Sequence, residues 1–187
     1  TNINQSGLFV NGSFFSRGGF NVGPRGLLGG TGQLIGKLTN DGMVAPGNSI
    51  GTLTVDGDFT QSSGGTLSME LRRPSITDQL IVTGKASLSG TLALRFLGDE
   101  ISYGDVVNLI TAAGGIEGGF DRIAGIPSIL RARPWTTGGR TNYNLIFAPR
   151  SYTQVAQGAN QTALASALDQ WIGVSTPGIS QATLQLD

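Results

Sequence analysis

Apolar and polar side chains alternate along the middle of the chain, between residues 51 and 96. A period of two is typical of strands that bury one face and expose the other. The pattern predicts a strand from residue 51 that bends near Asp56 and Gly57, with further strands after each polar interruption. The positions predicted to point inward are Leu53, Val55, Phe59, Leu67, Met69, Leu71, Val82, Leu88, Leu92, Leu94 and Phe96.

The same alternation returns later in the chain, at residues 106–110 and 143–149. The sequence VVNLI begins another predicted pair of strands, and YNLIFAP places Tyr143, Leu145 and Phe147 on one face. Gly84 and Gly90 interrupt the longest alternating run without changing its parity, so we expect them at corners between strands. The inward residues together are predicted to form the core and the folding nucleus of an all-β fold.

Short phrases repeat through this β-rich region. GTLTVDGDFTQSSG, GTLSMEL, LIVTGKASLSG and GTLALRF share a Gly-Thr-Leu or x-Val-x-Gly unit, and GLFVNGSFF carries the theme more loosely. Repeated short strands with glycine turns point to a solenoid, in which each coil buries its apolar face against its neighbours. A β-sandwich of unrelated topology would give similar alternation, so the repeats favour a β-helix without deciding between the two.

The segment from residue 151 to residue 187 differs in composition. It is rich in Ala and Gln, and its apolar positions follow helical spacing, with Asn160 as a candidate N-cap and Gly173 past the end. The spaced positions are Val155, Ala159, Ala163, Leu164, Leu168, Trp171 and Ile172. We expect this helix to pack against protein, because its polar face carries almost no Lys or Arg for a membrane surface. The last residues are expected to be weakly ordered.

Charge and composition exclude several classes of function. Twelve Lys and Arg residues balance twelve Asp and Glu residues without a block of one sign, which argues against nucleic-acid binding. Histidine and cysteine are both absent, which removes the commonest general base and the commonest transition-metal ligand. We therefore expect no catalytic residue, no metal and no cofactor. A start at Thr1 without Met suggests a piece of a longer precursor.

One sequence, GNSIG at residues 47–51, matches the G-x-S-x-G nucleophile elbow of serine hydrolases. An elbow serine needs a base within hydrogen-bond reach and lies between a strand and a helix. The chain has no histidine, neither lysine lies in a motif, and the strand-like TLTV follows. We predict instead a turn over Pro46, Gly47 and Asn48, with Gly or Asn at positive φ. Ser49 is not expected to be catalytic.

Other candidates have plain structural explanations. Asp56 and Asp58 could share a cation, but carboxylates beside a glycine turn are usually solvated. GGTGQLIG resembles a phosphate-binding loop, yet its third glycine falls one position late and no strand-to-helix context follows. Arginine pairs could bind an acidic glycan and tryptophans could stack on sugars, but surface charge and core or capping anchors are the commoner roles. These residues are Arg72, Arg73, Arg131, Arg133, Trp135 and Trp171.

Residues 37–169 resemble the C-terminal end of autotransporter passengers from Gram-negative bacteria. The likeness runs in order through LTNDGMVAPGNSIGTLTVDGDFTQSSGGTLSMEL, DQLIVTGKASLSGTLAL, YGDVVNLITAAGGIEGGFDRI and NYNLIFAPRSYTQVAQGANQTALASALD. The resemblance implies a right-handed parallel β-helix stem of the pertactin-like kind, capped by a β-sandwich or hairpin layer and followed by a short helix. It divides the chain into stem rungs at 1–50, an autochaperone region at 51–150 and a pre-barrel linker at 151–187.

The resemblance also implies a function. In the family, this region nucleates folding of the passenger and supports secretion through the periplasm and outer membrane to the cell surface. Its partners would be the upstream rungs of its own passenger, the C-terminal translocator barrel of the same precursor and a host-cell receptor, with no nucleic acid. Two alternatives stay open, namely an adhesin stem that binds host glycan or protein and a β-helix enzyme that acts on polysaccharides.

Overall fold

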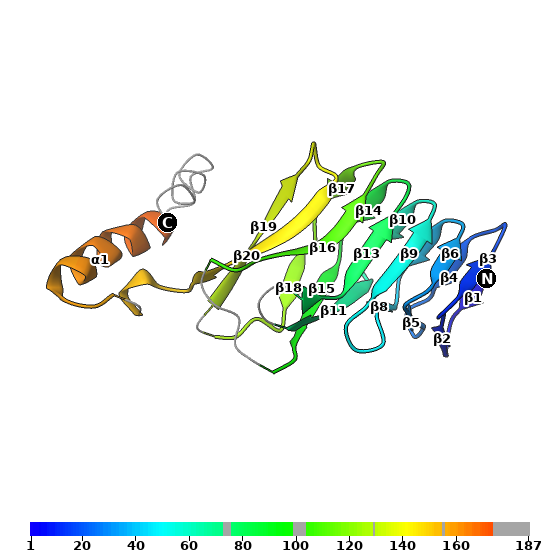
Figure 1. The fold of residues 1–187 in the computed structure, drawn as a ribbon, viewed down its shortest axis with the longest axis horizontal. Helices are drawn as coiled ribbons and strands as arrows, with labels where there is room; N and C mark the ends of the chain where they lie inside the picture. The colour runs from blue at the N-terminus through cyan, green and yellow to red at the C-terminus, as the bar shows by residue number, and fades with distance from the viewer. Residues whose placement is uncertain (73–75, 99–103, 129, 155, 174–187) are drawn as a thin grey trace.

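The computed structural model describes residues 1–72, 76–98, 104–128, 130–154 and 156–173. Within these residues the strands form three sheets, and each sheet runs along the length of the molecule (Figure 1). As the chain proceeds through the stack, it contributes one strand to each of the three sheets in turn. Within the stack, a strand that is not at either end therefore pairs with the strand one coil earlier and the strand one coil later. The pairing between coils is parallel in all three sheets, which agrees with the solenoid pattern and not with an antiparallel sandwich.

The strands of each sheet are short and evenly spaced along the chain. The first sheet contains β1 (Asn2–Ile3), β4 (Phe20–Val22), β7 (Leu38–Asn40), β10 (Phe59–Gln61), β14 (Ala86–Leu88) and β17 (Ile116–Gly118). The second contains β2 (Gly7–Phe9), β5 (Leu27–Gly30), β8 (Met43–Pro46), β11 (Thr66–Arg72), β15 (Thr91–Phe96) and β18 (Arg122–Ala124), with β12 (Ile76–Thr77) antiparallel on β11. The third contains β3 (Ser13–Phe15), β6 (Gln33–Ile35), β9 (Thr52–Asp56), β13 (Gln79–Val82) and β16 (Val106–Ala112).

Sharp corners join consecutive strands, and one of them corrects the prediction of a single bent strand from residue 51. The chain forms β9 in the third sheet, turns at Gly57 and continues as β10 in the first sheet. Gly84 and Gly90 lie at corners as expected. At Gly90 the φ angle is 69°, and a Cβ atom would lie 2.5 Å from the carbonyl oxygen of Gly65 in the coil below. Only glycine allows neighbouring coils to approach this closely there.

The third sheet ends differently from the other two. A hairpin of β19 (Leu130–Thr137) and β20 (Asn142–Pro149) extends it, with β20 antiparallel to β16. The tight turn between the two strands has positive φ at Gly138, Gly139 and Arg140. The C-terminal side of the stack thus carries an antiparallel layer that covers the edge of its last long strand.

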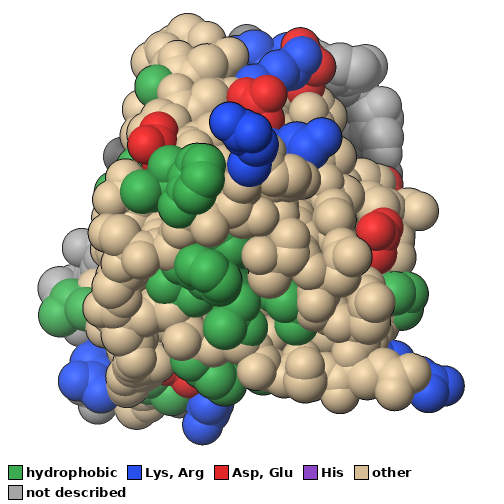
Figure 2. All heavy atoms as spheres, turned by 90° about the vertical axis from the view of Figure 1, so that its right-hand side faces the viewer, with side chains coloured by type: hydrophobic (Ala, Val, Ile, Leu, Met, Phe, Trp, Pro, Cys, Tyr) green, Lys and Arg blue, Asp and Glu red, His purple; other side chains and the backbone are tan. Residues whose placement is uncertain are grey.

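The N-terminal end of the stack is open by contrast. Strands β1, β2 and β3 are the first members of the three sheets, and each pairs on one side with the following coil. Hydrophobic side chains gather on this end face (Figure 2). Phe9 and Phe15 are 58% and 65% exposed. The two ends of the described stack therefore differ in both hydrogen bonding and hydrophobic exposure.

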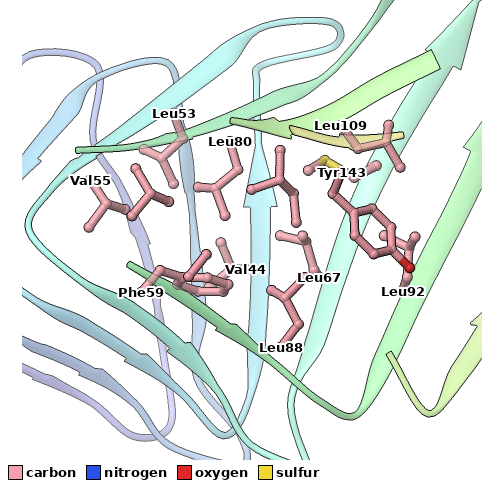
Figure 3. Packing of buried hydrophobic residues seen from close by; sticks show 14 of the residues in the cluster. Val44, Leu53, Val55, Phe59, Leu67, Leu80, Leu88, Leu92, Leu109 and Tyr143 are labelled. Carbon is pink, nitrogen blue, oxygen red and sulfur yellow. The ribbon is translucent and has the colours of Figure 1, made fainter. Parts of the chain in front are cut away.

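The core lies between the three sheets and follows the axis of the stack. Residues from different coils form vertical rows, such as Leu53 beside Leu80 beside Ile110, because the parallel register places them opposite one another. Leu53, Phe59 and Leu67 come from three different sheets and point into this common interior (Figure 3). An interior of this kind buries apolar surface through the stacking of successive coils.

Two amides lie inside this otherwise apolar interior. Asn40 and Gln61 are 0% and 2% exposed, and they share the inward parity of the aliphatic residues. Asn40 Nδ2 donates to Gln61 Oε1 at 3.0 Å, and Gln61 Nε2 donates to the carbonyl oxygens of Ser89 and Thr91 in the next coil. These bonds satisfy buried polar groups and connect three successive coils.

Beyond the hairpin, a short 3₁₀ helix η1 (Tyr152–Gln154) leads to helix α1 (Ala159–Gly173), which extends away from the β-rich body (Figure 1). The helix begins one residue before the predicted cap Asn160, and Gln161 accepts a hydrogen bond from the backbone of Gln157 instead. Gly173 is its last residue and does not lie past its end. Val155 lies outside the described residues. Among the residues described, no helix is both long and apolar enough to cross a bilayer.

Candidate functional site

The residues predicted as the core and folding nucleus lie in the interior or at its C-terminal end. Phe96 is partly buried and packs edge-to-face on Phe147, with ring centroids 5.9 Å apart. The others are at most 6% exposed: Leu53, Val55, Phe59, Leu67, Met69, Leu71, Val82, Leu88, Leu92, Leu94, Tyr143, Leu145 and Phe147. Tyr143 adds an edge-to-face contact with Phe120 at 5.3 Å, so the hairpin joins the core through aromatic packing.

Ser49 lies in an exposed loop between two strands. The loop follows β8 and precedes β9, so the strand-to-helix turn of a nucleophile elbow is missing. Positive φ falls on Gly47 at 91° and on Ser49 at 80°, whereas the sequence suggested Gly47 or Asn48. With no histidine in the chain to act as a base, this geometry is that of a loop and not of a catalytic serine.

The other acidic and glycine candidates connect neighbouring coils. Asp56 Oδ1 accepts a hydrogen bond from Thr83 at 2.9 Å, and Asp58 Oδ1 accepts one from the Lys85 backbone at 2.8 Å. Over the described parts of the chain, no three carboxylate, histidine or cysteine ligands gather as a metal site would require. The GGTGQLIG sequence leads into strand β6 and so lacks the helix that a phosphate-binding loop needs.

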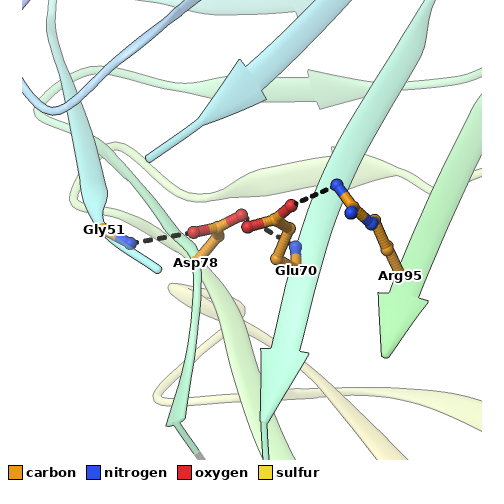
Figure 4. Close-up of polar contacts among 4 residues, drawn as sticks. All are labelled: Gly51, Glu70, Asp78 and Arg95. Atoms are coloured by element: carbon orange, nitrogen blue, oxygen red, sulfur yellow. Dashed lines mark hydrogen bonds and ion pairs between the residues drawn. The ribbon is translucent and has the colours of Figure 1, made fainter. Parts of the chain in front are cut away.

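A buried carboxyl lies near the middle of the stack. Asp78 is 1% exposed, directly before β13. Its Oδ1 accepts from the Gly51 backbone at 2.8 Å, and its Oδ2 accepts from the Glu70 backbone at 2.7 Å (Figure 4). The Glu70 side chain forms an ion pair with Arg95 at 2.8 Å. One carboxyl thus holds a loop, β11 and β13 together.

Burial dominates the electrostatics of this carboxyl. Removal from water raises the pKa of Asp78 to about 6, although the hydrogen bonds from Glu70 and Gly51 act in the opposite direction. The negative charge of Glu70 adds to the increase. A perturbed carboxyl can mark a catalytic site. Both oxygens of Asp78 are occupied by backbone donors, which is the arrangement of a structural connector.

A hollow lined by several charged side chains lies beside the hairpin. It has a volume of about 540 Å³ and runs between β18 and β19, the last strands of the second and third sheets. Three arginine side chains line it, namely Arg122, Arg131 and Arg150, against the single carboxylate of Asp121. We call this hollow the arginine groove. Sequence analysis singled out Arg131 but had no signal to connect it with Arg122 or Arg150.

The surroundings of the Arg131 guanidinium are unusual for a charged group. Its Nε and Nη2 atoms are buried without a hydrogen-bond partner, and the Cζ atom lies 6.0 Å from the centre of the Tyr152 ring. Burial, together with the positive charge of neighbouring Arg133, lowers the pKa of the Arg131 guanidinium. Arg72 is exposed at the end of β11, and Arg73 lies outside the described residues.

The aromatic and helical candidates differ from expectation. Trp135 is 50% exposed on β19 and does not serve as a core or capping anchor. The side chain of Trp171 lies outside what the structure describes. On α1 the predicted packing face is mostly exposed, because Ala159, Ala163 and Leu164 are exposed and Leu168 is half-buried. Ala165 is buried instead, and it is not among the predicted positions. The helix is joined to η1 by Asp169, which accepts hydrogen bonds from Ser151, Tyr152 and Thr153.

Searches against protein-family models and against curated proteins find no match for this chain.

Proposed function

We propose that this chain is a right-handed β-solenoid from the C-terminal end of an autotransporter passenger, and that it acts as an autochaperone. In this role it folds first and supports secretion of the passenger to the cell surface. Its partners are then the upstream coils of the same passenger and the translocator barrel of the same precursor. Besides the resemblance in sequence, the observation that most supports this role is an asymmetry of the stack: an antiparallel hairpin covers the last strand of the third sheet at the C-terminal end, and among the described residues no such hairpin covers the first coil.

The asymmetry bears on how a solenoid starts to fold. Parallel coils pair residues far apart in sequence, so the cost in loop entropy precedes the gain from contacts. A segment that is already folded removes this cost for the next coil, because it offers formed strand edges. Here the hairpin packs Tyr143, Leu145 and Phe147 into the C-terminal end of the core. The edges of β1, β2 and β3, with exposed Phe9 and Phe15, lie at the other end, where an upstream coil would add.

The test compares a substitution in the core with a substitution in a loop, each made in a full-length precursor, by their effect on display of the passenger at the cell surface. Leu92 is fully buried, so Leu92→Asp should cost about 3–5 kcal/mol by placing an unpaired charge in the core. We expect this variant to lose protease-resistant passenger at the cell surface. Ser49→Ala, in an exposed loop, should leave surface display unchanged. Normal display of the Leu92→Asp precursor would rule out the proposed role.

The adhesin alternative also has an observation in its favour. The arginine groove is a concave surface with an excess of positive charge, whereas Lys and Arg balance Asp and Glu over the whole chain. One solenoid can serve both roles, because folding depends on residues in the interior and binding depends on residues at the surface.

A further inference from the structure

The arginine groove has features that its structural role leaves unexplained. Arg131 is the clearest of them, because two of its nitrogen atoms are buried and donate to no group among the described residues. A buried donor without an acceptor destabilises the folded state. Asp169 lies close enough to favour the charged form of Arg131, but its carboxylate accepts from Ser151, Tyr152 and Thr153 instead. Among the described residues, the Arg131 guanidinium therefore brings a positive charge without an ion-pair partner to the lining of the groove.

The arginine side chains that line the groove come from three different parts of the chain. Arg122 follows the corner before β18, Arg131 projects from β19, and Arg150 follows β20. Arg150 donates only a long hydrogen bond of 3.4 Å to the Ser128 carbonyl, and none of the three forms an ion pair within the described residues. Planar guanidinium groups bind carboxylate and similar oxyanions in a bidentate manner.

The remaining lining of the groove narrows the class of ligand. Asp121 lines the groove, and its Oδ2 accepts from Ser89 and the Gly90 backbone, so a carboxylate acceptor is part of the lining beside the arginines. An acceptor in this position suits a ligand that carries hydroxyl donors as well as an anionic group, and it disfavours a ligand that is anionic throughout. Partly buried Phe120, Ile123 and Ile126 add an apolar wall. The volume of about 540 Å³ lies in the range of small-ligand sites.

We propose that the arginine groove binds an acidic saccharide of one or two rings. The sugar carboxylate pairs with Arg131, Arg122 and Arg150 flank it, a ring hydroxyl donates to Asp121, and the apolar ring face packs on the Phe120 side. This proposal does not depend on the autochaperone role, since it concerns the surface of the folded chain.

Isothermal titration of the chain with three matched probes tests the proposal. Digalacturonic acid carries two carboxylates on two rings, galabiose is the same disaccharide without them, and the dipeptide Glu-Glu carries its carboxylates on no ring. We expect digalacturonic acid to bind at least about tenfold more tightly than either of the others. Equal binding of galabiose or of Glu-Glu, or no binding of digalacturonic acid, would overturn the proposal.

Variants locate the site and separate binding from folding. Arg131→Met keeps the aliphatic stem and removes the unpartnered donors, so we expect it to bind at least about tenfold more weakly while its melting temperature rises. Arg150→Gln should also weaken binding. Arg17→Gln removes an equal charge from an exposed position at the opposite end and should bind normally. Unchanged binding by Arg131→Met, or equal loss in Arg17→Gln, would contradict the assignment.

Discussion

At the scale of single residues, Asp78 shows how one side chain fixes the position of one coil on the next. Its two carboxyl oxygens accept from Gly51, in the loop before β9, and from Glu70 on β11. The energetic cost is a carboxyl removed from water. The same residue therefore aligns the coils and makes their stability sensitive to pH.

This sensitivity has a definite sign. The pKa of Asp78 is raised from 3.8 to about 6 in the folded chain, so the folded state holds a proton that the unfolded state has lost between these values. The contribution of Asp78 to stability should therefore fall by up to about 3 kcal/mol as the pH rises from 4 to 6, and stay constant above that. Urea unfolding of the wild type and of Asp78→Asn at several pH values measures the difference.

We expect the advantage of the wild type over Asp78→Asn to be largest near pH 4 and to shrink toward pH 7. Asp121→Asn is the opposing control. Hydrogen bonds from Gly90 and Ser89 lower the pKa of Asp121, so its contribution is present at neutral pH and is lost as the pH falls. An advantage of the wild type over Asp78→Asn that grows with pH would contradict the assignment of Asp78.

Parity in the sequence predicts which aliphatic residues point inward, because a strand forces alternate side chains to opposite faces. It misses Asn40 and Gln61, which have the right parity but the wrong polarity. Their burial depends on acceptors such as the Ser89 and Thr91 carbonyls, which come close only when the coils stack. The arginine groove was hidden for the same reason, since its residues are distant in the sequence.

At the scale of elements, the hairpin of β19 and β20 determines how the stack ends. Strand β20 covers the edge of β16, while β19 provides the new edge of the sheet. That new edge carries Pro134, which has no N–H to donate, and two arginines. Proline and charge on an edge strand both disfavour pairing with other chains.

Weakening the hairpin should therefore have two effects. Leu145 is fully buried on β20, so Leu145→Asp should destabilise the chain by about 3–5 kcal/mol and expose the edge of β16. We expect a lower urea midpoint and concentration-dependent oligomers in light scattering. Trp135→Asp is the matched control on the neighbouring strand, where the side chain is 50% exposed, and it should change neither measurement appreciably.

The sequence predicts where the strands and the helix lie, but it predicts their contacts less well than it predicts the core residues. It places the strands of YNLIFAP and VVNLI, but it does not indicate that one pairs antiparallel on the other at the end of a parallel sheet. Alternation determines faces, whereas pairing direction depends on contacts between distant segments. The helix was foreseen by its spacing, but its exposed Leu164 was not, because spacing does not say whether a partner surface lies beside the helix.

At the scale of the whole molecule, the open end carries the larger tendency to associate. Phe9 and Phe15 are exposed beside the unpaired edges of β2 and β3. Exposed apolar groups on a free strand edge favour pairing with another chain. The double variant Phe9→Lys and Phe15→Lys should therefore reduce self-association in sedimentation velocity runs over a range of concentrations.

A matched change elsewhere checks this interpretation. Leu164 is 63% exposed on α1, away from the open end, so Leu164→Lys should leave self-association of the chain as it was. If the helix variant lowers association and the double variant does not, then the contact between chains lies at the C-terminal end instead.

The regular passage of the chain through three sheets has a consequence for length. One added coil contributes one strand to each sheet, so the stack can grow only in steps of about 4.8 Å, the distance between adjacent strands. A coil duplicated in the middle would meet the same neighbours as its template and leave both termini unaltered. Each coil added in the middle would therefore move the arginine groove farther from the N-terminal end by one strand spacing, and the residues that line the groove would stay the same.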